Sequence, residues 1–260
     1  MQHSVRYTIL FAAAVCVICA ILVSTSAVSL SDLQDANATL DKRKNVLLAA
    51  GLIETGQPLS AQQVEEIFKN VKAVAIDLKS GQEDPNIDPV AYDQQKAKND
   101  PALSRSAPEN LSVIKRLPNT AVVYHVLDDQ GQVRMIVLPI EGYGLWSTLY
   151  GFLALDADTK TILGLTYYDH GETPGLGGEV DNPRWKALWP GRVAFDENWA
   201  PAIAVVKGQA GPPSQDPHRV DGLSGATITS RGVTHMLDFW LGENGFGPYL
   251  ENFRRSRQLP

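Results

Sequence analysis

The sequence has very little cysteine and no long run of basic residues. Its 260 residues include only Cys16 and Cys19, and both lie in an apolar stretch near the N-terminus. The rest of the chain therefore lacks the thiols for a disulfide framework, a zinc–thiolate site or a protein-held iron–sulfur cluster. The formal net charge is -6, and no run of Lys or Arg is long enough to follow a phosphate backbone, which argues against nucleic-acid binding.

The N-terminal stretch from Tyr7 to Leu30 carries no charged side chain. About 20 apolar residues in a helix are enough to span the hydrocarbon core of a bilayer. A cleaved signal peptide is the alternative, because small residues at 24–29 follow a shorter apolar core, but the length favours an uncleaved anchor. We therefore expect a transmembrane anchor over residues 1–31 and one globular domain over residues 32–260.

Charges that flank the apolar stretch bear on its orientation. Arg6 precedes the stretch and Asp32 and Asp35 follow it, which favours a domain on the periplasmic face, although basic residues at 42–44 weaken this inference. Cys16 and Cys19 form a C-x-x-C pair. We interpret them as two small apolar residues on one side of a membrane helix rather than as a redox pair.

The remaining pattern predicts an α+β fold, in which antiparallel hairpins of strands are flanked by helices. Alternating apolar residues with turn signals between them predict two hairpins. Residues 82–109 are polar and rich in Asp, Pro, Gln and Ser, and we expect a loop or insertion there. The expected helices are 33–50, 60–72 and 233–241, and the expected strands are 74–78, 121–127, 133–140, 151–156 and 162–168.

Three glycine-rich clusters, at 142–147, 170–178 and 221–230, mark places where the backbone approaches a ligand closely. In the third cluster, Thr229 or Ser230 is the expected N-cap of the last helix, whose apolar side chains recur from Val233 to Leu241 and which Gly242 is expected to end. Thr227 would then lie at a helix N-terminus, where free amides and the helix dipole favour an anion, and Arg231 would add positive charge. An ordinary capped loop is the alternative for this cluster.

The second cluster contains His170 and Glu172, which could form an acid–base pair. The spacing is not that of the H-E-x-x-H zinc motif. We expect no metal site.

Residues 221–227 read Asp-Gly-Leu-Ser-Gly-Ala-Thr, which resembles the flavinylation motif D-x-x-S/T-G-A-T of the FMN-binding domain family. In that family a flavin transferase moves FMN from FAD onto the last threonine as a phosphoester. The resemblance implies covalent FMN on Thr227. It also implies a cofactor-binding role for the other motif residues, namely Asp221, Ser224, Gly225 and Ala226.

Residues 170–177 are similar to a segment shared by the NqrC family of the sodium-translocating NADH:quinone reductases and the RnfG family of the Rnf complexes, and residues 178–185 resemble the former family. That resemblance implies an electron-transfer subunit of a six-subunit complex in the bacterial inner membrane. Electrons would come from an iron–sulfur centre and pass to another flavin, on the flavin subunit NqrB, toward ubiquinone. The chain alone would not oxidise NADH, because it lacks a dinucleotide-binding fingerprint.

The resemblance also suggests which residues surround the flavin ring. We expect one wall from the second cluster and a second wall from Leu145 and Trp146, although these two side chains are equally compatible with the protein core. Two other functions remain open: an Rnf-type subunit, and an anchored periplasmic binding protein with an unmodified Thr227. The residues expected in the first wall are Glu172, Thr173, Gly175, Leu176 and Gly177.

Overall fold

The computed structural model describes residues 4–257, which divide into two compact units between Arg43 and Lys44. The first unit is the N-terminal part of helix α1 (Val5–Ala49), and it contains a segment long and apolar enough to cross a membrane. Residues 1–3 of the predicted anchor lie outside the described part. Helix α1 runs without interruption through the predicted anchor and the helix predicted over 33–50.

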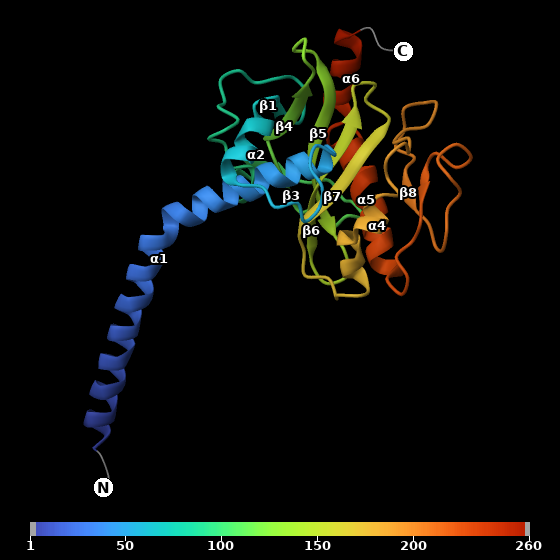
Figure 1. Ribbon diagram of the computed structural model, residues 1–260. Helices are drawn as coiled ribbons and strands as arrows, with labels where there is room; N and C mark the ends of the chain where they lie inside the picture. The colour runs from blue at the N-terminus through green and yellow to red at the C-terminus, as the bar shows by residue number, and fades with distance from the viewer. Residues whose placement is uncertain (1–3, 258–260) are drawn as a thin grey trace. The chain divides into compact units, whose positions relative to one another are not determined.

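The second unit is built on one antiparallel sheet of five strands (Figure 1), as predicted for an α+β fold. The strand order is β1-β4-β5-β6-β7, and each neighbouring pair is antiparallel. Both predicted hairpins are confirmed. The strands are β1 (Val71–Asp77), β4 (Thr120–Leu127), β5 (Val133–Tyr143), β6 (Thr148–Asp156) and β7 (Ile162–Asp169).

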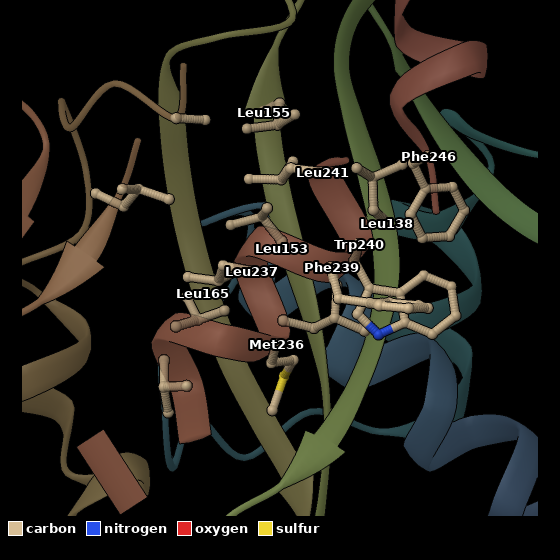
Figure 2. Close-up of a cluster of buried hydrophobic side chains, with 14 of the residues drawn as sticks. Leu138, Leu153, Leu155, Leu165, Met236, Leu237, Phe239, Trp240, Leu241 and Phe246 are labelled. Carbon is tan, nitrogen blue, oxygen red and sulfur yellow. The ribbon is translucent and has the colours of Figure 1, made fainter. Parts of the chain in front are cut away.

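Helix α5 (Thr227–Leu241) packs against one face of this sheet. Figure 2 shows Met236 and Leu237 of the helix beside strand residues such as Leu153, all of them fully buried. Burial of an aliphatic side chain contributes roughly 1.5–3 kcal/mol, so this face supplies much of the stability. Gly242 ends the helix, as the sequence predicted. Helix α6 (Gly247–Ser256) follows.

The last turn of α1 and helix α2 (Ala61–Phe68) belong to the opposite face of the sheet. The carbonyl of Ala49 approaches Gly164 of β7 so closely that a Cβ there would lie 2.2 Å from it. Ser60 and Gln63 form a capping box at the start of α2, which begins where the sequence predicts a helix. The helix ends at Phe68, earlier than predicted, because the chain enters β1 at Val71.

Residues 82–109, predicted as a polar loop or insertion, contain a short helix and a strand. Lys98, in helix α3 (Gln94–Asn99), forms an ion pair of 2.8 Å with Glu141 of β5, and both side chains are largely buried. Strand β2 (Ser104–Ser106) pairs with β3 (Arg116–Pro118). The segment is therefore tied to the main sheet through long-range contacts.

The segment between β7 and α5 carries the predicted site cluster 170–178 and the first part of the cluster 221–230. Its regular elements are short, and the guanidinium of buried Arg192 holds the segment together through the backbone carbonyls of Leu188, Gly211 and Asp216. The elements are η1 (Gly177–Asp181), α4 (Pro183–Lys186) and the parallel pair β8 (Ala204–Val205) and β9 (Arg219–Val220).

Candidate functional site

Helix α5 begins at Thr227, so the prediction that Thr229 or Ser230 caps it is wrong. Ala226 is the N-cap residue and makes no side-chain capping hydrogen bond. The two hydroxyls predicted to cap the helix are buried and engaged elsewhere. Thr229 donates to Glu172 at 2.7 Å, and the Ser230 hydroxyl accepts from the Leu223 amide at 3.0 Å. Thr227 itself is exposed.

The start of α5 offers a place for an anion next to the Thr227 hydroxyl. The first intrahelical hydrogen bond runs from the Ser230 amide to the Ala226 carbonyl at 3.0 Å, so the amides of residues 227–229 precede any helical carbonyl partner. Arg231 is exposed and stands four residues after Thr227, on the same face of the helix. The amides, the helix dipole and this guanidinium all favour negative charge.

Hydrogen bonds from the rest of the domain hold the loop before Thr227. The Asp221 carboxylate accepts from the Ala210 amide at 2.9 Å, and its carbonyl accepts from the Trp185 indole at 2.8 Å. Gly225 turns the chain with φ of +71°, a conformation that favours glycine. These contacts leave Ser224, Gly225 and Thr227 exposed at one end of α5.

Glu172 joins the three glycine-rich clusters. Its Oε1 accepts from the consecutive amides of Leu145, Trp146 and Ser147, at 3.0, 2.8 and 3.2 Å, and its Oε2 accepts from the Thr229 hydroxyl. The side chain is 5% exposed. Burial alone raises the pKa of this carboxyl, but the hydrogen bonds from Thr229, Trp146, Ser147 and Leu145 outweigh burial and hold the pKa below its ordinary value.

Two glycines are required for this arrangement. A Cβ at Gly177 would lie 2.4 Å from Glu172 Oε2 and 2.7 Å from Thr229 Oγ1, and one at Gly144 would lie 2.6 Å from Glu172 Oε1. Gly225 is likewise close to Leu176, because a Cβ there would lie 2.9 Å from the leucine Cδ2. The structure therefore brings together residues from all three clusters.

Large apolar side chains are exposed around this end of α5. Trp146 is 65% exposed and Leu145 38%, so the alternative that they belong to the core is wrong. Leu176 and Ile228 are also exposed. Sequence analysis did not single out Ile228, although its position directly after Thr227 could have identified it. An exposed hydroxyl, free amides and apolar side chains together suit a phosphate attached to a planar apolar ring, and so fit FMN.

His170 and Glu172 do not form the acid–base pair that the sequence suggests. His170 Nε2 lies 2.9 Å from Asp181 Oδ2, and its Nδ1 accepts from the backbone amide of Glu172 at 3.3 Å. Lys186 pairs with the same aspartate at 3.1 Å. The Glu172 carboxylate is directed to Thr229 and the 145–147 amides instead.

A hollow of about 350 Å³ lies away from Thr227, near the C-terminal end of α5. It is lined by side chains that include Glu109, His235, Asp238 and Glu243, and by none of the predicted site residues. The candidate site around Thr227 is separate from this hollow, and Thr227, Leu145, Trp146 and Leu176 are all exposed there.

Comparison with known proteins finds a family model over part of the chain and relatives over nearly all of it. The model of the FMN-binding domain family matches residues 144–242. The C-type subunit of the Na(+)-translocating NADH-quinone reductase from Pseudomonas aeruginosa is 46% identical over 98% of this chain and 98% of its own length. The corresponding protein from Yersinia pestis is 44% identical over 98% and 95%. The crystal structure of Shewanella oneidensis NqrC matches with a TM-score of 0.77 and 36% identity, over 84% of this chain and 99% of that chain.

Proposed function

The chain belongs to the NqrC family of the Na(+)-translocating NADH-quinone reductases, and from this membership we propose that it carries FMN as a phosphoester on Thr227. The observation that supports the linkage most directly is the placement of Thr227. It is the last residue of the flavinylation-like motif, it is exposed, and it is the first residue of α5. The nearby hydroxyls of Thr229 and Ser230 are buried and engaged.

The residues around Thr227 divide between the phosphate and the ring of the flavin. The amides of residues 227–229 and the Arg231 guanidinium would hold the phosphate oxygens that remain charged after esterification. Leu145 and Trp146 would form one wall for the ring, and Leu176 the other. Thr173 and Gly175, both exposed and close to Leu176 in the chain, would border the same space.

FMN, when bound, supplies the capacity to accept and donate electrons. The chain keeps the carrier at a fixed place, because a covalent link prevents its loss in any redox state. We propose that the subunit receives electrons from an iron–sulfur centre and passes them to a flavin on another subunit of the complex. NADH and ubiquinone would react on other subunits.

Helix α1 would hold the domain at the bacterial inner membrane as a single-pass anchor, with the domain on the periplasmic side. Maturation would require a flavin transferase able to reach Thr227. The exposed Ser224 and Gly225 leave this segment accessible to such an enzyme.

The mass of the intact chain tests this function. The full-length protein, expressed with its flavin transferase and purified in detergent, should gain the mass of one FMN minus water. Thr227→Ala should abolish the gain. Thr173→Ala changes another exposed threonine of the site and should retain it. An unmodified wild-type chain beside an active transferase, or a modified Thr227→Ala chain, would contradict the proposal.

A further inference from the structure

Glu172 was expected against the flavin ring, but both of its carboxylate oxygens are occupied by the protein. One oxygen takes three consecutive amides of the Leu145–Ser147 loop, and the other takes the hydroxyl of Thr229. The side chain is 5% exposed. Such a carboxylate has little surface left for a ligand. Glu172 can therefore contribute to the flavin site only through the residues that it holds.

We propose that Glu172 is a positioning residue, which ties the Leu145–Ser147 loop to the first turn of α5 and so fixes the Trp146 wall relative to Thr227. The measurements on the flavin rest on the proposed function. The connection between the loop and α5 does not, because it is made by the protein alone. Thr229 is only two residues from Thr227, so the carboxylate links the loop to the segment that would carry the flavin.

The loop is the short turn between β5 and β6, and its exposed side chains, Leu145 and Trp146, do not bury it. Within the hairpin, the Tyr143 hydroxyl donates to the Trp146 carbonyl at 3.0 Å. The loop is anchored at Ser147, whose hydroxyl accepts from the Gly171 amide at 2.6 Å, and at Gly144, whose amide donates to the Ser147 carbonyl at 2.8 Å. Those contacts close the turn upon itself and upon Gly171, whereas the Glu172 carboxylate connects the loop amides with α5.

The tie also places a negative charge next to the flavin site. The four groups that donate to Glu172 are three amides and a hydroxyl, all neutral, and no ion pair of the described residues includes this carboxylate. An ionised carboxylate near the flavin opposes the addition of negative charge to it. A merely structural role predicts no shift of the flavin potential when the charge is removed and the shape of the side chain is kept, so a near-isosteric substitution of Glu172 separates the two roles.

Three variants separate the tie from the charge. Thr229→Val removes the hydroxyl from α5 but retains the carboxylate. Glu172→Gln retains an oxygen acceptor for the loop but removes the charge, and Glu172→Ala removes both. Glu179→Gln is the matched control. Glu179 lies with Glu172 in the segment between β7 and α5, and it also accepts a hydrogen bond, from Asn182 at 2.6 Å.

Amide exchange in the full-length chain tests the tie without any flavin. In a Thr227→Ala background, which should carry none, Glu172→Ala and Thr229→Val should each make the amides of residues 145–147 exchange about tenfold faster or more. The Glu179→Gln chain should match its parent. If neither Glu172→Ala nor Thr229→Val accelerates exchange, the tie is absent and the proposal is overturned, whatever Thr227 carries.

The flavin-loaded chain tests the positioning. Glu172→Ala and Thr229→Val should lower the fluorescence anisotropy of the attached flavin. Glu172→Gln should move its midpoint potential in the positive direction by about 59 mV or more, which is tenfold in a one-electron equilibrium. Unchanged anisotropy and potential in all three variants, with the flavin mass present, would overturn the positioning role. A wild-type chain without the flavin mass would instead contradict the function of Thr227, and the exchange experiment would still decide the tie.

Discussion

At the scale of single residues, the neighbours of a hydroxyl decide whether it is available for modification. Thr227, Thr229 and Ser230 lie within four positions of one another, but only Thr227 is exposed. Thr229 is bonded to Glu172, and Ser230 to the amide of Leu223. The geometry therefore favours one residue out of three, which composition and local spacing do not distinguish.

Arg231 offers a direct test of the anion site at the start of α5. Because its guanidinium is one helical turn from Thr227, Arg231→Gln should slow the transfer of FMN to Thr227 by about two- to fivefold, as expected for the loss of one exposed charge pair with the phosphate. In-gel flavin fluorescence after timed incubation with the transferase measures the rate. The difference from the wild type should shrink as salt is added.

The control for this variant is Arg184→Gln. Arg184 is also a basic residue of the globular unit, but it lies in α4 rather than in the first turn of α5. This variant should flavinylate at the wild-type rate. An equal loss in both variants would mean that the net charge of the domain, rather than the local charge beside Thr227, governs the reaction.

At the scale of secondary-structure elements, the last turn of α1 belongs to the core of the globular unit. Leu47 is fully buried, so Leu47→Ala should lower the free energy of unfolding by about 2–5 kcal/mol through lost contacts and a cavity. For a unit of this size each kcal/mol corresponds to a Tm change of roughly 2–4 °C. Thermal unfolding of the full chain in detergent, followed by near-ultraviolet circular dichroism, measures the shift.

Leu33→Ala provides the comparison on the same helix. Leu33 is 62% exposed and lies in the first unit, so its truncation should leave the Tm of the domain close to that of the wild type. A similar loss in both variants would contradict the assignment of residues 44–49 to the domain core.

A buried histidine attaches helix α6 to the sheet. Because this histidine can be protonated, the stability of the folded domain depends on pH. His125 of β4 contacts the Tyr249 hydroxyl of α6, and burial, with the nearby Lys72 and Arg257, lowers the pKa of His125 to about 4. The unfolded chain has the ordinary value of 6.5 and binds the proton more tightly. The free energy of unfolding therefore keeps the full contribution of the neutral His125 above pH 6.5. It falls by about 3 kcal/mol as the pH falls toward 4.

Urea unfolding between pH 4 and 7 measures this loss, with His125→Phe as the comparison. The variant cannot be protonated at this position, so its stability should fall less steeply over the same interval, even if it is lower at pH 7 because Tyr249 loses its partner. Parallel pH profiles for the two proteins would show that His125 does not cause the dependence.

The secondary-structure elements differ in how well the sequence predicts them. The hairpins β4–β5 and β6–β7 have period-two patterns and turn residues close together in the chain, so local reasoning found them. The segment 82–119 is ordered by contacts that local sequence patterns cannot reveal. One of them is the ion pair of Lys98 with Glu141, which are 43 residues apart. The same limit applies to the site, because local spacing makes Thr229 a candidate cap, whereas its hydroxyl binds the distant Glu172.

At the scale of the whole molecule, the proposed topology places the domain and the flavin on the periplasmic side of the membrane. The chain is suited to a test of this topology, because its only two cysteines, Cys16 and Cys19, lie within the apolar part of α1. Replacing both with serine leaves a chain without thiols. Single cysteines can then be introduced as Gln130→Cys, in the exposed turn after β4, or as Ser4→Cys, before the apolar segment.

A membrane-impermeant maleimide, added to intact cells with a permeabilised outer membrane, should label the Gln130→Cys chain and leave the Ser4→Cys chain unlabelled until the cells are lysed. The charges around the apolar stretch are the physical reason, because Arg6 precedes it and two aspartates follow it. The opposite pattern would place Thr227 in the cytoplasm. The flavin transferase and the electron partners would then have to act on the cytoplasmic side, and the residue-level account of the flavin site would stand unchanged on the other face of the membrane.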